Sequence, residues 1–211
     1  SLYCINIINS NLNISGLKII NSNIGIYVSN TKDKNKIKIY NNIFYNNTNA
    51  ILVNRGNNNH IFKNIFLNNS EDIRFYNSSN NNIYNNSFLS DSKYAIYFQN
   101  NVKNSIINDN LIIEKKNGVY LHKNSDNNLI YNNNISDNGY GIISYFCNNI
   151  SIIENYLFNN SNGALDLRDS RFIIITNNTF IYNYYGILVD NSANYSDLNN
   201  NFFNKNTQDI K

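Results

Sequence analysis

The sequence predicts an all-β solenoid of about nine coils, each about 23 residues long and built from three short strands. Three observations lead to this prediction. A position that is nearly always asparagine recurs along the chain, apolar residues recur at fixed distances from it, and a short alternating segment closes each repeat. The composition is also that of a repetitive sequence, since about a quarter of the 211 residues are asparagine and about a sixth are isoleucine.

The asparagine position defines the repeat, and its successive members lie 22 to 25 residues apart. These anchor residues are Leu17, Asn42, Asn64, Asn86, Asn110, Asn133, Asn155, Asn178 and Asn201. Three residues before each anchor lies a branched aliphatic residue, from Ile14, Ile39, Ile61, Ile83, Ile107, Ile130, Ile152, Ile175 and Leu198. Two residues after each anchor lies an apolar residue, from Ile19, Phe44, Phe66, Phe88, Ile112, Ile135, Leu157, Phe180 and Phe203. The two apolar columns predict inward-facing positions on two sides of each coil.

A small residue followed by an alternating segment closes each repeat and predicts its third strand. Gly118-Val119-Tyr120-Leu121 is a clear copy, whereas Asp72-Ile73-Arg74-Phe75 is an imperfect one. One coil cannot bury its apolar side chains against itself. About five inward aliphatics contribute about 10 kcal/mol, and ordering the backbone of a coil opposes folding by several times that amount. The coils must therefore stack, about 4.8 Å apart, into a rod.

The anchor asparagines are expected at corners, because Asn tolerates left-handed backbone better than other non-glycine residues. Each amide can also hydrogen-bond to its equivalents one coil above and below, which predicts a ladder along the stack formed by Asn42, Asn64, Asn86, Asn110, Asn133, Asn155, Asn178 and Asn201. A second, looser column follows five residues later and is expected at an exposed corner: Asn47, Asn69, Asp91, Lys115, Asn138, Asn160, Asn183 and Asn206. The lysine-rich segment 31–38 predicts a solvated loop.

Two segments carry a resemblance to a known family: residues 39–47, IYNNIFYNN, and residues 130–142, IYNNNISDNGYGI. They resemble the repeats of the NosD-like and carbohydrate-binding/sugar-hydrolase group. The resemblance runs from about Leu12 to Ile210 and implies a right-handed parallel β-helix. The group is widespread in adhesin-like surface proteins of methanogenic archaea. It includes polysaccharide lyases, epimerases, copper-site maturation proteins and non-catalytic scaffolds, so the resemblance leaves the activity open.

Charge, hydropathy and cysteine content exclude several classes of partner. A net charge of +3 with 15% charged residues is too small for nucleic-acid binding. No apolar run approaches the roughly 18 residues of a membrane span. Cys4 and Cys147 lie about six coils apart, too far for a disulfide, and two thiols with two histidines supply too few ligands for a metal. We therefore expect no metal and no cofactor.

Residues 1–211 are expected to form a single β-helix domain, either a segment of a longer solenoid or a unit that stacks end to end. Both ends stop part-way through a coil, and neither carries the polar cap or amphipathic helix that normally covers an open edge. The expected partners are further coils of the parent chain or copies of the same chain, with a surface polysaccharide as a further one.

Outward positions of the third strand place four polar residues on consecutive coils: His122, Tyr145, Arg168 and Asp190. A lyase or epimerase acting on a uronate polymer needs a base, an acid and a cation that neutralises the carboxylate. His122, Tyr145 and Arg168 match these roles. The structural alternative is that Arg168 pairs with Asp190 and Asp169 on a wet surface while the other two cover a strand.

Tyrosines on the same face predict a binding site without chemistry: Tyr76, Tyr97, Tyr120 and Tyr145. Their rings can stack on sugar rings, although tyrosine is also simply a good strand former. Ten Asn-x-Ser/Thr sequons are glycosylation candidates if the chain is extracellular: Asn13, Asn46, Asn68, Asn77, Asn85, Asn134, Asn149, Asn159, Asn177 and Asn194.

The sequence favours a structural role, that of a rigid exported β-helical scaffold in an adhesin-like protein at the cell surface or outside the cell, self-assembling through its ends. The alternatives are a carbohydrate-active enzyme, which would use the four polar residues, and a non-catalytic polysaccharide-binding module. Few histidines and glutamates, and no long loops to wall a pocket, count against catalysis.

Overall fold

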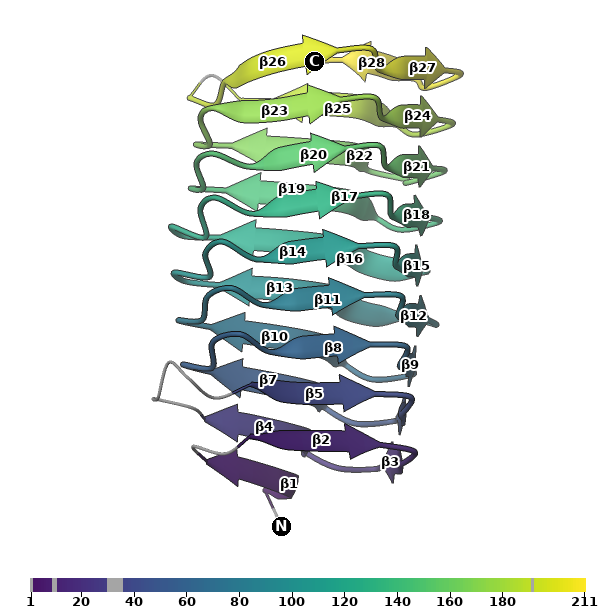
Figure 1. Ribbon diagram of the computed structural model, residues 1–211. Coiled ribbons are helices and arrows are strands. Elements are labelled where there is room, and N and C mark those ends of the chain that lie inside the picture. The colour runs from purple at the N-terminus through teal and green to yellow at the C-terminus, as the bar shows by residue number, and fades with distance from the viewer. Residues whose placement is uncertain (1, 9–10, 30–35, 191) are drawn as a thin grey trace.

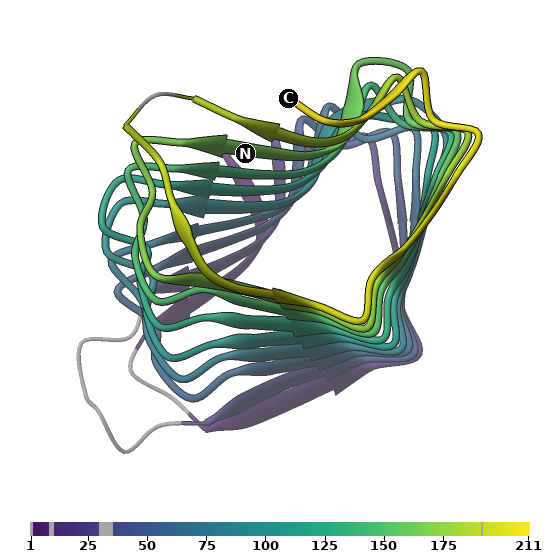
Figure 2. The ribbon, with the colours of Figure 1, turned by 90° about the horizontal axis from the view of Figure 1, so that it is seen from above.

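The computed structural model describes residues 2–8, 11–29, 36–190 and 192–211, and every regular element within these ranges is a β-strand. The strands form three parallel sheets that run the length of a rod, with the two termini at opposite ends (Figure 1). We call the sheets A, B and C, and their strands are given below. Each coil passes through sheets B, C and A in turn, and a view along the rod shows the coils superposed (Figure 2). The predicted all-β solenoid of three-stranded coils is confirmed.

Sheet A has ten strands: β1 (Tyr3–Ile8), β4 (Ile24–Ser29), β7 (Asn49–Asn54), β10 (Glu71–Tyr76), β13 (Ser92–Gln99), β16 (Lys115–His122), β19 (Tyr140–Tyr145), β22 (Gly163–Arg168), β25 (Tyr185–Val189) and β28 (Gln208–Ile210). Sheet B has nine strands: β2 (Leu12–Ser15), β5 (Ile37–Tyr40), β8 (His60–Phe62), β11 (Asn82–Tyr84), β14 (Ile106–Asn108), β17 (Leu129–Tyr131), β20 (Ser151–Ile153), β23 (Ile173–Thr176) and β26 (Tyr195–Asn199).

Sheet C also has nine strands: β3 (Lys18–Ile20), β6 (Ile43–Tyr45), β9 (Ile65–Leu67), β12 (Ser87–Leu89), β15 (Leu111–Ile113), β18 (Asn134–Ser136), β21 (Tyr156–Phe158), β24 (Thr179–Ile181) and β27 (Phe202–Asn204). Of the lysine-rich segment expected as a loop, residues 31–35 lie outside the described ranges, and Ile37 and Lys38 belong to β5. No helix in the described ranges is long and apolar enough to cross a membrane.

The inward apolar columns form the core of the rod. Ile61 and Ile83 pair in register in sheet B and are fully buried. In sheet C the rings of Phe44, Phe66 and Phe88 stack in sequence, with centroids 5.0 and 4.7 Å apart. Each such side chain contributes about 1.5–3 kcal/mol when it is fully buried. Because the atoms that cover it come from the coils above and below, stacking supplies most of this burial.

The anchor asparagines form the predicted ladder at the corner between sheets B and C. Asn133 shows the pattern: its Oδ1 accepts hydrogen bonds from the backbone N–H and from the Nδ2 of Asn110, each at 3.0 Å. Its Nδ2 donates to Asn155 Oδ1 at 3.0 Å and to the backbone oxygen of Ile107 at 2.9 Å. Each buried amide is therefore satisfied by groups of the neighbouring coils, as a buried polar group requires.

The expected left-handed backbone lies one residue earlier than predicted. The anchors are absent from the residues with positive φ, and the residue before each anchor takes that conformation instead: Gly16, Asn41, Lys63, Asn85, Asp109, Asn132, Glu154, Asn177 and Asn200. The chain bends from sheet B into sheet C at this residue, whose side chain lies at the surface of the rod. The next residue then turns its amide inward and can join the ladder.

The second column, expected at an exposed corner, is instead a second buried ladder between sheets C and A. Asn47 Nδ2 donates to Asn69 Oδ1 at 2.9 Å, and Asn138 Nδ2 donates to Asn160 Oδ1 at 3.0 Å. Asp91 alone among these residues of the middle coils is exposed. The register explains why: Ser92 pairs with Lys115, so one extra residue in this coil puts Ser92, not Asp91, in the ladder position.

Truncating a ladder asparagine should destabilise the rod strongly. We expect Asn133→Ala to lower the free energy of unfolding by about 2–4 kcal/mol, because it leaves buried donors and acceptors of two neighbouring coils unpaired. Asn134→Ala, at the adjacent exposed position, should change it by less than about 0.5 kcal/mol. Chemical denaturation of the two variants measures the difference, and equal stabilities would contradict the ladder's role.

Candidate functional site on the outer face of sheet A

The middle strands of sheet A carry the densest group of aromatic and charged side chains on the outside of the rod. We call it the tyrosine face, and it consists of Glu71, Arg74, Tyr94, Tyr97, Gln99, Tyr120, His122, Tyr145, Asp166 and Arg168. His122, Tyr145 and Arg168 fall in one column as predicted, whereas the register of β22 with β25 ends at Val189 and does not include Asp190. Tyr97 pairs with Tyr120, His122 with Tyr145, and Tyr145 with Arg168 in the register of adjacent strands. Because strand residues alternate between the two faces of a sheet, these paired side chains point outward. Tyr94 and Glu71 lie three residues before Tyr97 and Arg74, and they join the face through their contacts with those two side chains.

The aromatic side chains of this face stack on one another along the rod. The ring centroids of Tyr97 and Tyr120 are 5.2 Å apart with planes 7° apart. His122 continues the stack, 5.6 Å from Tyr120 and 5.4 Å from Tyr145. Tyr94 joins it 4.6 Å from Tyr97. In this geometry the ring faces cover each other, and Tyr97 is only 8% exposed.

Burial in the stack shifts the pKa of Tyr97, Tyr120 and His122 in the direction that favours their uncharged forms. Burial raises the pKa of Tyr97, and it raises the pKa of Tyr120 to about 12. Burial, and to a smaller extent the charge of Lys123, lowers the pKa of His122. The His122 Nδ1 lies 3.4 Å from the hydroxyl of Tyr97. A neutral imidazole can accept a proton, so this histidine retains the protonation state that a general base needs.

Two arginines flank the stack, and each is paired with other protein groups. On one side Arg74 lies over the Tyr97 ring at 5.2 Å, and its Nε donates to Gln99 Oε1 at 2.8 Å. On the other side Arg168 Nε donates to Asp166 Oδ1 at 2.9 Å. Asp166 is fully buried although it occupies an outward position. Hydrogen bonding to this carboxylate raises the pKa of Arg168.

Asp190, the fourth predicted catalytic residue, shapes a turn. Its carboxylate accepts hydrogen bonds from the backbone N–H groups of Ser192 at 3.0 Å, Ala193 at 2.8 Å and Asp169 at 3.3 Å. Although burial opposes the effect, these donors lower the pKa of Asp190. The expected pairing of Arg168 with Asp190 and Asp169 is wrong. Asp166, two residues away on the same face of β22, is the carboxylate that pairs with the guanidinium.

The structure thus brings together part of the predicted set. His122 and Tyr145 are in ring contact, whereas Arg168 is bound to Asp166 and Asp190 is engaged with backbone. Tyr76 is separated from His122 by Gln99 in the register. Sequence reasoning missed Tyr94, which lies just before the small residue of its coil. Tyrosine recurs at this position as Tyr140 and Tyr185, and that recurrence was the available signal.

The described residues enclose no pocket, so the tyrosine face is an open surface. Nine of the ten sequon asparagines are exposed and Asn77 is half-buried, so all ten lie at the surface of the rod. Most belong to corners, and Asn13 and Asn134 lie at the outside of strands β2 and β18. Glycosylation at these positions stays a prediction.

Two family descriptions match the sequence. "Periplasmic copper-binding protein (NosD)" matches residues 71–211, and "right handed beta helix region" matches residues 1–135. The chain belongs to the NosD-type right-handed β-helix family. This agrees with the resemblance carried by residues 39–47 and 130–142. No curated protein matches this NosD-type chain in sequence.

Among solved structures, this NosD-type chain is similar to DFA-IIIase from Arthrobacter chlorophenolicus A6 without its lid, with a TM-score of 0.56 and 13% identity. The similarity covers 84% of this chain and 62% of that one, so the chain spans less than two thirds of that enzyme structure. It is also similar to the A-module of the mannuronan C-5 epimerase AlgE4 from Azotobacter vinelandii, with a TM-score of 0.52 and 13% identity over 99% of this chain and 76% of that one. At this identity the likeness shows the fold alone.

The residues of this chain do not fit the copper in the family's description. Within the described ranges no three His, Cys, Asp or Glu side chains gather where a metal ion could bind. His60 lies in sheet B and His122 in sheet A. The buried Cys147 is a poor ligand, since burial raises the pKa of its thiol to about 12 and thiolate is the binding form. The described residues therefore provide no site for copper.

The titration of His122 provides a direct check of the stack. Both histidines should titrate below the ordinary value of 6.5, because the pKa of each is lowered by burial and by nearby lysines. The histidines then bind more protons in the unfolded chain than in the folded one as the pH falls below 6.5, so their contribution to the free energy of unfolding should decrease in that range. Asp72, whose pKa burial raises to about 6, acts in the opposite direction. Nuclear magnetic resonance resolves the two midpoints. His122→Phe, which keeps an aromatic ring in the stack, is the control and should lose one of them; a His122 midpoint above 6.5 would contradict the geometry.

Proposed function

We propose that this NosD-type chain is a structural protein: an exported, adhesin-like β-helical scaffold of the cell surface. One observation carries the proposal. The residues of the chemically richest face are engaged in holding the coils together, since ring faces cover ring faces and the flanking charges are paired within the protein. A sugar ring stacks on an aromatic side chain only where a ring face is open.

Aromatic stacking elsewhere on the rod supports a structural reading of the tyrosine face. On the outside of sheet B, Tyr40, Phe62 and Tyr84 stack with centroids 4.9 Å apart and planes 5° apart. None of the four predicted catalytic residues lies in this column, although His60 lies edge-on to the Tyr84 ring at 6.5 Å. The same stacking therefore also occurs away from the predicted catalytic set, which supports the view that the spacing of the coils produces the tyrosine face.

The proposed location outside the cytoplasm is supported by the family's description, which is periplasmic. The surface position of the sequon asparagines is compatible with it. For partners, we propose further coils of a parent chain or a second copy of this chain. Among the described strands, β1 and β28 are the outermost of sheet A, and a strand at the edge of a sheet can pair with another strand.

The end-to-end association is tested by sedimentation velocity at rising protein concentration. We expect larger species to accumulate, and Phe202→Lys should suppress them, since Phe202 lies on the last strand of sheet C and is 55% exposed. Phe172→Lys is the matched control, because this side chain is 57% exposed but lies in an inner coil. A monomer at every concentration, or equal effects of both substitutions, would contradict association through the ends.

A second candidate function is a carbohydrate-active lyase or epimerase, or a polysaccharide-binding module. It is favoured by the adjacency of His122 and Tyr145 to Arg168, whose side chain is 46% exposed. In that case His122 would act as base, Tyr145 as acid and Arg168 as the cation, with Tyr97 and Tyr120 beside them. A polymer substrate could lie along an open face of the rod.

One set of assays separates these functions. The scaffold proposal predicts that incubation with uronate polymers gives neither unsaturated products nor epimerisation. It also predicts that the protein does not bind these polymers in a gel-retardation assay. It also predicts that Tyr120→Ala lowers the free energy of unfolding by about 2–4 kcal/mol through lost stacking, whereas Tyr131→Ala in sheet B changes it less.

If uronate polymers are turned over and the activity disappears in His122→Ala, the protein is an enzyme and the scaffold proposal is wrong. If the protein binds the polymers without turning them over, and the binding is lost in Tyr145→Ala, the protein is a polysaccharide-binding module and the scaffold proposal is wrong. A Tyr120→Ala variant as stable as the parent protein would remove the observation on which the scaffold proposal depends.

A further inference from the structure

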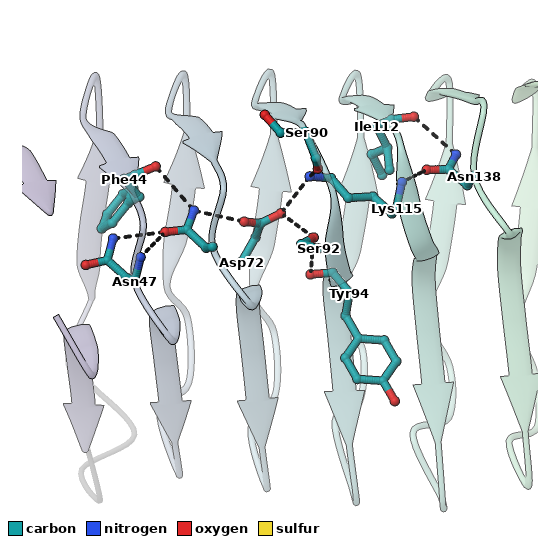
Figure 3. A network of polar contacts seen from close by, with 10 residues as sticks. Phe44, Asn47, Asp72, Ser90, Ser92, Tyr94, Ile112, Lys115 and Asn138 are labelled. Carbon is teal, nitrogen blue, oxygen red and sulfur yellow. Dashed lines mark hydrogen bonds and ion pairs between the residues drawn. The ribbon is translucent and has the colours of Figure 1, made fainter. Parts of the chain in front are cut away.

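The second asparagine ladder is interrupted in the middle of the rod, and a buried pair of charged side chains fills the gap (Figure 3). The ladder runs through Asn47 and Asn69, stops, and starts again at Asn138. Between these segments lie Asp72, which takes the place of the small residue in its coil, and Lys115, which takes the place of a ladder asparagine. Lys115 belongs to the second coil after that of Asp72, so its side chain passes the coil between them.

The two side chains are held against each other and are shielded from water. Lys115 Nζ lies 3.3 Å from Asp72 Oδ2, and both side chains are 0% exposed. Asn69 Nδ2 donates to Asp72 Oδ1 at 3.0 Å, and Ser92 Oγ donates to Asp72 Oδ2 at 3.1 Å. The Lys115 ammonium also donates to the backbone oxygen of Ser90. Each oxygen of the carboxyl group thus has its own hydrogen-bond donor.

We propose that Lys115 and Asp72 condense to an intramolecular isopeptide bond, which makes this pair a self-modification site in the interior of the rod. The bond would join Nζ of Lys115 to Cγ of Asp72 and release one water molecule. It would link two coils covalently across the coil between them, at the point where the asparagine ladder is broken.

The surroundings favour the uncharged forms that the condensation needs. Burial raises the pKa of Asp72 to about 6, against the opposing effect of the Lys115 charge. Burial lowers the pKa of Lys115, while Asp72 and, more weakly, Asp91 and Glu114 act in the other direction. One proton transfer within the ion pair gives an amine and a carboxylic acid. A neutral amine is a nucleophile, and a neutral carboxyl group is a far better electrophile than a carboxylate.

The reaction balances without any other reagent. The lone pair of Nζ forms the bond to Cγ, and the carbonyl electrons move to Oδ1, where the Asn69 N–H stabilises the oxyanion as in an oxyanion hole. The nitrogen then loses a proton, which passes to Oδ2 with the Ser92 hydroxyl in hydrogen-bond reach as a relay. The carbonyl re-forms, the bond from Cγ to Oδ2 breaks, and water leaves with both protons. No oxidant, cofactor or activated donor is involved.

The other ion pairs of the described residues lack these conditions. The Lys103 and Asp126 side chains are 38% and 17% exposed, so water keeps both charged. The remaining two pairs contain arginine, Arg74 with Glu71 and Arg168 with Asp166, and a guanidinium stays protonated and does not attack a carboxyl group. Among the described ion pairs, only that of Lys115 with Asp72 is completely buried, contains a lysine and has a hydrogen-bond donor at each carboxyl oxygen.

The test is the mass of the intact, denatured chain. After incubation of the folded protein at neutral pH, we expect it to be lighter than the sequence requires by one water molecule. Digestion with trypsin should give a branched peptide that joins the Asp72 segment to the Lys115 segment, with no cleavage after Lys115 because its amine is acylated. The full sequence mass after prolonged incubation, together with free Asp72 and Lys115 peptides, would overturn the proposal and leave an ordinary buried ion pair.

Matched variants exclude other losses of water. Lys115→Met and Asp72→Ala should both show the full mass, and Lys116→Met, at the exposed neighbouring lysine, should retain the loss. Cyclisation of an aspartate with its own backbone also releases one water, but it would persist in Lys115→Met and give no branched peptide; that outcome would overturn the assignment. If a core variant fails to fold, the branched peptide of the unaltered protein still decides the question.

Discussion

The rod depends on one constraint: each coil must turn sharply at its corners without leaving a buried amide unpaired. An asparagine meets this constraint because its oxygen accepts from a backbone N–H of the preceding coil, while its nitrogen donates to a carbonyl there and to the next amide. Asn133 makes all of these bonds, and each partner belongs to another coil. The corners are therefore satisfied only when neighbours are present on both sides. This explains, together with shared apolar burial, why a coil has no stability of its own.

The spacing imposed by the ladders also organises the outer face. Strands about 4.8 Å apart bring side chains of adjacent coils to the distance at which aromatic rings stack. The stacks of Tyr97 with Tyr120 and of Phe62 with Tyr84 follow from that coincidence. A row of aromatic residues on a β-helix is thus weak evidence for a binding site. Enzymes of similar fold show that the same coil geometry can support chemistry, but the fold does not determine which side chains carry it.

The repeat made the core and the first ladder predictable, because Ile61, Ile83 and Asn133 each recur in a column whose chemistry allows one explanation. The left-handed position was misplaced by one residue since most corners read Asn-Asn, and either asparagine suits a turn. Lys63 and Glu154 were the available signal, because neither side chain carries an amide that could continue the chain of hydrogen bonds. The partner of Arg168 depends on which of three nearby carboxylates reaches the guanidinium. That is a matter of side-chain geometry, which a repeat pattern does not encode.

The buried ion pair follows from a single irregularity in the repeat. One extra residue in the coil of β13 puts Ser92 in the ladder position, and a serine cannot continue a chain of amides. Asn69 then lacks the acceptor that an asparagine would provide, and Asp72 supplies it. A buried carboxylate is costly alone, so Lys115 provides the compensating charge. Regular coils place identical amides beside each other, and identical amides do not react. An irregular coil must be repaired with complementary groups, and an amine beside a carboxyl group is a pair that can form a bond.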